Sequence, residues 1–579
     1  MTATITAALA GSGNWSKTDA GTLILDADNS GYTGTITLSA GTLRALQANA
    51  LGSGAAALTL AGGTLQLANN ANTNFGRNVT VTGNTTLVAD RATSSNTAQN
   101  HTLGTLTTVG ARTITVNRGG NSTGGTGQIT FGAATLGGNT TFTVNSNAQL
   151  NLTGTVSDGG SGFAITKGGG GLLLLSGTAG NTFSGGVTIT GGTVQVQGNS
   201  TGSNLGTGTV TLTGGTLNTR YNGGGSNLVL NNVSNNFLLN GNATIRVDRS
   251  SANTGNTMAF GSLTVSGNRQ LTVNSGNAYI ASFNGITLNG NLTLAGNGPV
   301  VAAAAITEDA TPRSLTYTGS NRLPLTTANS FSGALSVNGG FVRTTDSAQL
   351  GTNPTVNLGR GVLELRSDTN LTTWSQTVNV TNNGVIRVDR AGASATGNTL
   401  RIGALTIGSN TLGVSGNNGY RLEVQGTTTV SGNSVINAHG LVLNAVSGSG
   451  SLTQAGNGGG TLTLAGPATH TGGTNVTGGT LVVARNGTDT LGTGAVGVGA
   501  GGTLRFDPGG AGTATVAVPS VSVASGGAIV AGTGITDLGS TVVNLAGGGY
   551  VGGLVEGRIA GGSIDTATAN PGNFGVRTG

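Results

Sequence analysis

The chain of 579 residues has no cysteine, two methionines, eight prolines and few aromatic residues (3%), and only 7% of its residues are charged. The absence of cysteine excludes disulfides, thiol catalysis and cysteine-based metal sites. Lysines (Lys17 and Lys167) and glutamates are scarce, and no stretch has an amphipathic helical period. No apolar run approaches the roughly 20 residues of a membrane-spanning helix, so we expect no membrane insertion by this chain.

The charge is low and dispersed. The formal net charge is +6, and the arginines are spread from Arg44 to Arg577 without a dense cluster. A nucleic-acid interface needs a concentrated basic face, so nucleic acid is not an expected partner. The excess of arginine favours at most a weak attraction to anionic polysaccharide or lipid.

Glycine is abundant (109 residues), and the 36% of hydrophobic residues recur in short alternating runs. A Gly-Thr-Leu tripeptide marks a short period, with steps of 19 to 23 residues between successive copies. It occurs at 21–23, 41–43, 63–65, 460–462, 479–481 and 502–504. Each unit holds two or three strands of about five residues separated by turns of Gly, Asn, Ser and Thr.

One such unit cannot bury its own apolar side chains, but stacked units can. The sequence therefore predicts an all-β fold: a single-stranded, right-handed parallel β-helix (β-solenoid) with about 19–23 residues per coil. Leu23 and Leu25 alternate on one face and should point inward, whereas threonine, glutamine and asparagine should face outward. At about 21 residues per coil, the chain would make roughly 27 coils.

A longer period divides the chain into modules of about seven coils. One element reads Asn-x-x-Thr-Gly or a variant, as in Asn181–Gly185, and an x-Leu-Gly turn follows it. A second element carries an Asp-Arg pair. We expect one continuous solenoid with module 1 at 1–150, module 2 at 151–300, module 3 at 301–440, a partial module 4 at 441–548 and a C-terminal exit or linker at 549–579.

These modules resemble the autotransporter-associated β-strand repeats of large bacterial surface proteins. The resemblance rests on Gly169–Leu174 followed by Asn181–Gly186 and Gly191–Val194, and on 458–464 followed by Gly478–Leu481. It implies a β-helical passenger exposed outside the cell, often adhesive or structural. It supplies no catalytic residues.

The Asp-Arg pairs are the sharpest candidates for contact or structural roles. They are Asp90 and Arg91, Asp248 and Arg249, and Asp389 and Arg390. One interpretation is a local salt bridge that clamps a corner of the coil, which contributes at most about 1 kcal/mol when exposed. The other is a periodic docking point for a glycan or for a neighbouring rod.

Other polar residues favour ordinary structural roles. Glu308-Asp309 and Asp26/Asp28 are the closest acidic pairs, and both read as loop acids; the second lacks the Glu that a calcium loop requires at its last position. The three histidines have no nearby companions for a zinc site. They are His101, His439 and His470. We therefore expect no catalytic residues, no cofactor and no metal.

The sequence thus predicts a non-enzymatic, extracellular or cell-surface structural or adhesive protein that forms a rigid rod. Self-association, end to end or lateral, into fibres or a surface layer is expected, and a surface glycan is a further candidate partner. The main alternative is a carbohydrate-binding or polysaccharide-cleaving β-helix. A minor one is an ice-binding solenoid, suggested by Thr-x-Thr strands such as Thr105–Thr107.

Overall fold

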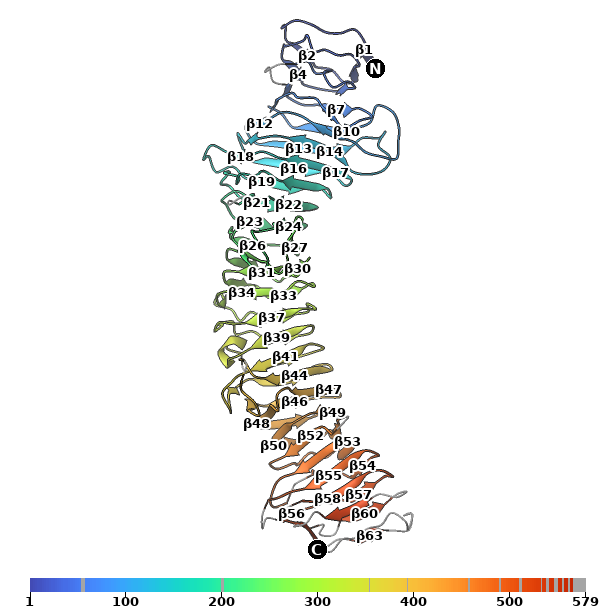
Figure 1. The fold of residues 1–579 in the computed structure, drawn as a ribbon, viewed down its shortest axis with the longest axis vertical. Coiled ribbons are helices and arrows are strands. Elements are labelled where there is room, and N and C mark those ends of the chain that lie inside the picture. Colours follow the sequence, from blue (N-terminus) through green and yellow to red (C-terminus); the bar gives the residue numbers. More distant parts are fainter. Residues whose placement is uncertain are drawn as a thin grey trace. The chain divides into compact units, whose positions relative to one another are not determined.

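The computed structural model describes residues 1–53, 58–198, 203–353, 355–392, 394–456, 459–488, 491–509, 513–532, 534–537, 541–545, 550–553, 557–560 and 563–565. The chain divides into two compact units, Met1–Ala304 and Ala305–Gly579. In each unit short strands stack on one another with parallel pairing (Figure 1). A 3-10 helix, η1 (Ser347–Leu350), is the one helix among the described residues. The predicted all-β solenoid is confirmed.

Two sheets of unit 1 begin at its first coils, and every strand pairs in parallel with the next strand of its sheet. The first sheet contains β1 (Thr2–Ile5), β3 (Thr22–Leu25), β5 (Thr42–Ala45), β7 (Thr64–Ala68), β10 (Thr85–Asp90), β13 (Arg112–Arg118), β16 (Thr140–Val144), β19 (Ile165–Gly168), β21 (Val187–Ile189), β23 (Val210–Leu212), β26 (Phe237–Leu239), β29 (Leu263–Ser266) and β32 (Ile286–Asn289). The second contains β2 (Trp15–Lys17), β4 (Ile36–Leu38), β6 (Leu58–Leu60), β9 (Val79–Val81), β12 (Leu106–Thr108), β15 (Ala134–Thr135) and β18 (Val156–Ser157).

Two further sheets complete the coils of unit 1. The third contains β8 (Thr73–Asn74), β11 (Asn100–Thr102), β14 (Gly127–Phe131), β17 (Ala148–Leu152), β20 (Leu172–Leu175), β22 (Thr193–Gln197), β24 (Thr216–Arg220), β27 (Ala243–Asp248), β30 (Arg269–Ser275) and β33 (Leu292–Ala295). The fourth contains β25 (Val229–Leu230), β28 (Thr257–Phe260), β31 (Ile280–Phe283) and β34 (Val300–Ala302).

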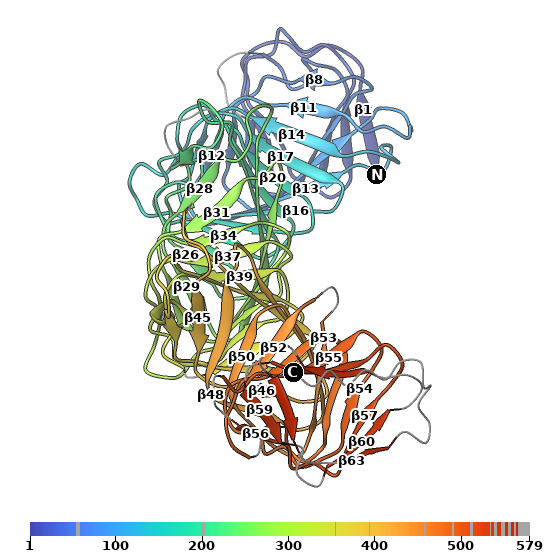
Figure 2. The same ribbon diagram turned by 60° about the horizontal axis from the view of Figure 1, so that its bottom comes forward.

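Unit 2 begins with β35 (Ile306–Glu308) and has two long sheets, whose strands are coloured from yellow-green to red in Figure 2. One contains β36 (Leu315–Tyr317), β38 (Leu335–Val337), β40 (Thr355–Leu358), β43 (Thr377–Val380), β46 (Leu405–Ile407), β48 (Arg421–Val430), β50 (Leu441–Ser447), β52 (Thr461–Leu464), β53 (Thr474–Val483), β55 (Gly502–Phe506), β58 (Ala528–Ala531) and β61 (Tyr550–Gly553). The other contains β37 (Arg322–Leu325), β39 (Phe341–Thr344), β41 (Val362–Arg366), β44 (Gly384–Asp389), β47 (Thr411–Gly416), β49 (Asn433–Ala438), β51 (Ser451–Ala455), β53 again, β54 (Val496–Val498), β57 (Ser520–Val523), β60 (Val542–Leu545) and β63 (Ser563–Asp565). Shorter sets are β42 (Thr373–Trp374) with β45 (Thr399–Ile402), and β56 (Thr513–Thr515), β59 (Gly534–Asp537) and β62 (Gly557–Ala560).

Three strands, β61 to β63, lie within the segment 549–579 that the sequence assigned to an exit or linker, and each continues the parallel pairing. The other residues of that segment lie outside the described residues. Among the described residues no helix is long and apolar enough to cross a bilayer.

Aliphatic side chains stack in register along the inside of each unit. On the first sheet of unit 1, Leu43 pairs with Leu65 and Leu65 with Leu87, and all three are buried. Leu25 is buried as predicted, whereas Leu23, nearer the start of the stack, is half-buried. Because alternate residues of a strand face opposite sides, every second residue contributes to this core, and each buried Leu or Val contributes about 1.5–3 kcal/mol.

Coil length varies more than the spacing of Gly-Thr-Leu suggests. Early coils step by 20 residues, as from Thr2 to Thr22, but Thr86 pairs with Thr115, a step of 29. The longer coils contain the loops that follow the Asp-Arg pairs, such as 91–99. The described strands therefore make about 22 turns, fewer than the 27 expected from a uniform coil.

Each Asn-x-x-Thr-Gly element contains one side chain with a phenyl, phenol or imidazole ring. This ring packs against the glycine of the x-Leu-Gly turn one coil later. These glycines have φ between +70° and +85°, and a Cβ on any of them would lie 2.8–2.9 Å from a ring carbon. The contact thus requires glycine for its backbone and for space. The four ring–glycine pairs are Tyr32 with Gly52, Phe183 with Gly206, Phe331 with Gly351, and His470 with Gly492.

A buried asparagine two or three residues before the ring ties three coils together. The Oδ1 of Asn181 accepts a hydrogen bond from the Val156 N–H of the coil before (2.8 Å), and its Nδ2 donates to the Asn204 carbonyl of the coil after (2.6 Å). Asn29 and Asn329 make the equivalent bonds. In the fourth element Ala468 stands at this position and is buried.

A buried polar residue closes the glycine-rich corner before the next strand. Lys167 is fully buried, and its Nζ donates to the carbonyls of Gly168 (2.8 Å) and Gly169 (2.9 Å). Burial lowers the pKa of Lys167 to about 8. Gln454 occupies the same repeat position and donates to the Gly460 carbonyl at 3.4 Å. The corner therefore needs a buried donor more than it needs a charge.

Replacing Gly206 with alanine should lower the free energy of unfolding by more than the about 1–2 kcal/mol that a left-handed alanine costs, because the Cβ also meets the Phe183 ring. Chemical unfolding and amide exchange of β21 and β23 measure the effect. Gly76→Ala is the matched control, because Gly76 has the same left-handed backbone (φ +67°), is exposed, and a Cβ there has no neighbour within 4 Å. Equal losses in both variants would contradict the ring–glycine contact.

Replacing His470 with phenylalanine, as at Phe183 and Phe331, should reduce acid sensitivity. Burial lowers the pKa of His470 below 6.5. Below pH 6.5 the unfolded chain therefore binds more protons than the folded one, and the free energy of unfolding decreases as the pH decreases. The wild type should lose more unfolding free energy than His470→Phe between pH 7 and 5. Parallel stability–pH curves for the two proteins would refute this.

Candidate interaction surface

The three Asp-Arg pairs lie at equivalent places in the fold. Asp90, Asp248 and Asp389 are the last residues of β10, β27 and β44, and the arginine that follows each begins a loop. Ile245 and Val247 point inward, so Asp248 lies on the outward face of its strand. All three aspartates are nevertheless buried, with at most 6% of their surface exposed, because the loops cover them.

Each aspartate accepts hydrogen bonds from the coil that follows. Asp90 Oδ1 accepts from the backbone N–H groups of Asn121 (3.0 Å) and Ser122 (3.2 Å). Asp248 Oδ1 accepts from Asn277 Nδ2 at 2.6 Å. These bonds tie the end of one strand to a turn one coil further on.

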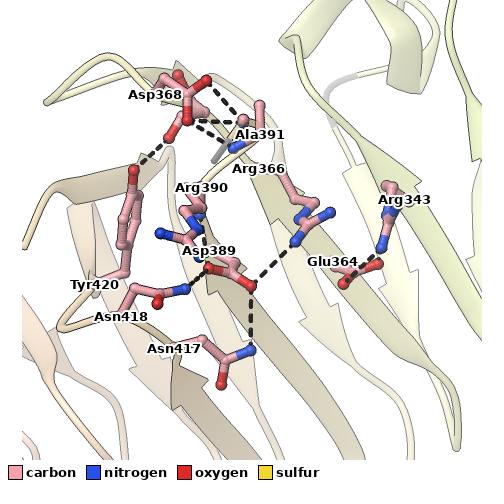
Figure 3. A network of polar contacts seen from close by, with 12 residues as sticks. Arg343, Glu364, Arg366, Asp368, Asp389, Arg390, Ala391, Asn417, Asn418 and Tyr420 are labelled. Atoms are coloured by element: carbon pink, nitrogen blue, oxygen red, sulfur yellow. Dashed lines mark hydrogen bonds and ion pairs between the residues drawn. The ribbon is translucent and has the colours of Figure 1, made fainter. Parts of the chain in front are cut away.

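In the third pair, shown in Figure 3, two asparagines donate hydrogen bonds to the carboxylate of Asp389. Asn418 Nδ2 donates to Asp389 Oδ1 (2.7 Å), and Asn417 Nδ2 donates to Oδ2 (3.2 Å). Burial alone would raise the pKa of Asp389, but these bonds, the Arg390 N–H and the Arg366 guanidinium outweigh it and lower the pKa to about 2. The carboxylate is thus held ionised.

A side chain of the coil before each Asp-Arg pair accepts hydrogen bonds from the loop that follows the pair. Asn222 Oδ1 accepts from the N–H groups of Ser250 (3.0 Å) and Ser251 (2.9 Å). Asp368 accepts in the same way from Ala391 and Gly392, as Figure 3 shows for Ala391. Asn70 accepts from Thr93 N–H in the first module. We call this arrangement of three successive coils the three-coil clamp.

The arginines of the pairs contribute mainly through their backbones. The N–H groups of Arg249 and Arg390 each donate to the preceding aspartate at 2.8 Å. The ion pairs of Asp248 and Asp389 go to other arginines. Arg246 lies 3.0 Å from Asp248, and Arg366, one coil earlier, lies 3.1 Å from Asp389. The arrangement fits the corner-clamp interpretation. The ionic partners of Asp248 and Asp389, however, are not the arginines that follow them in the sequence.

A cluster that the sequence analysis missed lies beside the third clamp in unit 2. Arg343 on β39 and Arg387 on β44 flank Glu364 on β41 in register. Arg343 Nε lies 2.7 Å from Glu364 Oε2, and Figure 3 shows both side chains on neighbouring strands. These residues are about 20 apart in the chain, so only the coil register, which the sequence did not define, brings them together.

Most of the other candidate residues have structural partners. Glu308 accepts from Arg313 N–H and Ser332 Oγ, and Asp309 pairs with Arg313 at 2.8 Å. Asp28 caps a turn through Ser30 N–H, and Asp26 accepts from Gln47. His101 and His470 are buried, whereas His439 is exposed in a turn. No group of three metal-ligating side chains occurs among the described residues.

Threonines form a column on the second sheet of unit 1. Its strands are two or three residues long, so each presents one outward side chain and the column is one residue wide. The column is therefore a line of hydroxyl groups, not the two-dimensional array that an ice surface would need. In register it contains Ser16, Thr37, Thr59, Thr80, Thr107, Thr135 and Ser157.

The fold and its ring–glycine elements define a modular parallel β-solenoid. Four segments match the passenger-associated-transport-repeat family: residues 16–45, 165–196, 315–343 and 457–483. The chain thus carries the repeats of autotransporter passengers, as the sequence predicted, one near the start of each module. No curated protein and no solved structure is significantly similar to the chain.

Replacing Asp389 with asparagine should destabilise the protein near neutral pH and flatten its acid unfolding. The folded pKa of about 2 lies below the ordinary value of 3.8 for an aspartate, so the carboxylate stabilises the fold above pH 3.8 and this contribution is lost as the pH falls through 2. Unfolding free energies of both proteins at pH 7 and pH 2.5 measure the effect. A difference that persists unchanged at pH 2.5 would contradict the role of the ionised carboxylate.

Proposed function

We propose that this chain is a surface-exposed autotransporter passenger that acts as a structural or adhesive spacer. The observation that carries the proposal is the fourfold recurrence of a passenger-associated-transport-repeat within a β-solenoid. Each matched segment contains the ring of the ring–glycine contact or the donor that closes the glycine-rich corner, so the repeat is a unit of the fold.

The mechanism is geometric. Each coil contacts mainly its neighbours, so coils add in sequence and present their outward side chains at a regular strand spacing of about 4.8 Å. Such a surface suits multivalent contact with a polymer or with another copy of the chain. Self-association, lateral or end to end, into fibres or a surface layer is part of the proposal. The same side chains act by contact and position, without a chemical step.

Exposure outside the cell is the testable core of the proposal. An epitope inserted after Gly509, an exposed loop residue whose surroundings are open, should be labelled by antibody on intact bacteria that produce the full-length protein. Added protease should remove the epitope from the same cells. A cytoplasmic protein with the same epitope is the control for lysis. Labelling that appears only after permeabilisation would overturn the proposal.

A further inference from the structure

Four neighbouring strands of unit 2 share an unusually basic outward face. Outward positions of β37, β39, β41 and β44 are two residues apart along each strand and in register between strands. One column reads Pro324, Arg343, Glu364 and Arg387, and the column beside it begins with Arg322 and Phe341. Arg366, at the end of β41, lies on the same face. We call this the arginine face.

Glu364 is the fixed centre of the arginine face. Arg343 donates to it through Nε (2.7 Å) and Nη2 (3.2 Å), and Arg322 Nε lies 3.5 Å from it. Its side chain is only 3% exposed, whereas those of Arg322 and Arg343 are 42% and 26% exposed. The carboxylate therefore lies beneath the guanidinium groups and holds them in place.

Phe341 positions two further guanidinium contacts. The Arg322 guanidinium carbon lies 5.8 Å from the ring centroid, and that of Arg387 lies 5.3 Å from it. Cation–π contacts hold both guanidinium groups against the ring. The two side chains are therefore already ordered before a ligand binds. Preorganised guanidinium groups lose less entropy on binding than free ones.

The charge of the face remains positive after its internal pairs are counted. Arg322, Arg343, Arg366 and Arg387 face Glu364 and Asp389, and Asp389 is only 8% exposed at its side chain. Arg360, exposed in the turn before β41, adds to the same edge. At the far ends of the strands, Asp346 and Asp368 cap η1 and the Arg390 loop, so their carboxylates are occupied by backbone N–H groups.

The preceding module shows that the fold does not require Arg322 and Arg343, although it keeps an arginine, Arg246, at the place of Arg387. The equivalent column on β20, β22, β24 and β27 reads Leu174, Gln195, Asn218 and Arg246 in the same register. There, Asn218 donates to Gln195 at 2.9 Å, and this neutral amide pair replaces the Arg–Glu contact. The two columns have the same net charge, and the extra cation of the arginine face is Arg322, which stands where the preceding module has Leu172. The coil forms with leucine at that place, so Arg322 needs a reason other than folding.

We propose that the arginine face binds an anionic polysaccharide through its carboxylate or sulfate groups. Guanidinium groups pair with such anions in a bidentate manner, and groups repeated from coil to coil suit a linear polymer. The contacts of Arg322 and Arg387 with the ring leave Phe341 poorly placed for the base stacking that single-stranded nucleic acid uses. The face itself carries no exposed large apolar residue among those the structure describes, which disfavours a lipid surface.

The test compares two double variants of the full chain that lose the same charge. Arg322→Gln with Arg387→Gln removes two exposed guanidinium groups from the arginine face. Arg112→Gln with Arg269→Gln is the matched control in unit 1, where each arginine donates to the carbonyl of its own preceding residue. Binding to hyaluronate and dextran sulfate is measured by calorimetry at several salt concentrations, with neutral dextran as the blank and circular dichroism as a check of folding.

The wild type should bind at least one polyanion with salt-dependent affinity and should not bind neutral dextran. The arginine-face variant should bind at least tenfold more weakly and with a smaller salt slope, and the control variant within twofold of the wild type. Equal weakening of both variants would show a general charge effect and overturn the proposal. Absence of polyanion binding, or tighter binding to anionic vesicles or single-stranded DNA, would also overturn it.

Discussion

Hydrogen bonding between one coil and the next is the constraint on which this protein depends. A single strand cannot satisfy its backbone groups alone, and in each unit the parallel register supplies partners from the coils before and after. The register also aligns like residues, as in the Leu43, Leu65 and Leu87 stack. A coil with additional residues must therefore place them in a loop outside the strands, because a shifted register would turn its apolar side chains outward.

The buried polar residues serve this register. Asn181 bonds to the coils on both sides, Lys167 closes a corner from within, and Asp389 fastens a long loop to its neighbours. Each replaces backbone pairing where the chain turns or leaves the strand, since unpaired groups buried there would cost several kcal/mol. These three residues thus act at corners and loops, whereas the stacked strands bury mainly aliphatic side chains.

The fold could be predicted from the sequence because its signals are periodic: alternating apolar residues, glycine at corners and a repeated Gly-Thr-Leu. The aspartates of the clamps could also be found, since Asp90, Asp248 and Asp389 recur in one context. Their partners could not. Asp389 and Asn418 are separated by a loop whose length differs from coil to coil, so the pairing depends on a register that no single repeat defines. Coil number was overestimated for the same reason.

One register position shows where such a chain is free to change. Gln66, Asn218 and Glu364 occupy the same outward place in three modules, and they bind an aspartate, a glutamine and an arginine respectively. The inward neighbours of these residues are leucines, except for Thr219 beside Asn218, because the core admits mainly apolar side chains. Outward positions face water and one neighbouring rung, so a substitution there alters the surface without altering the stack. Differences between modules in these columns, rather than in the repeats that build the coils, are therefore where distinct binding properties can arise.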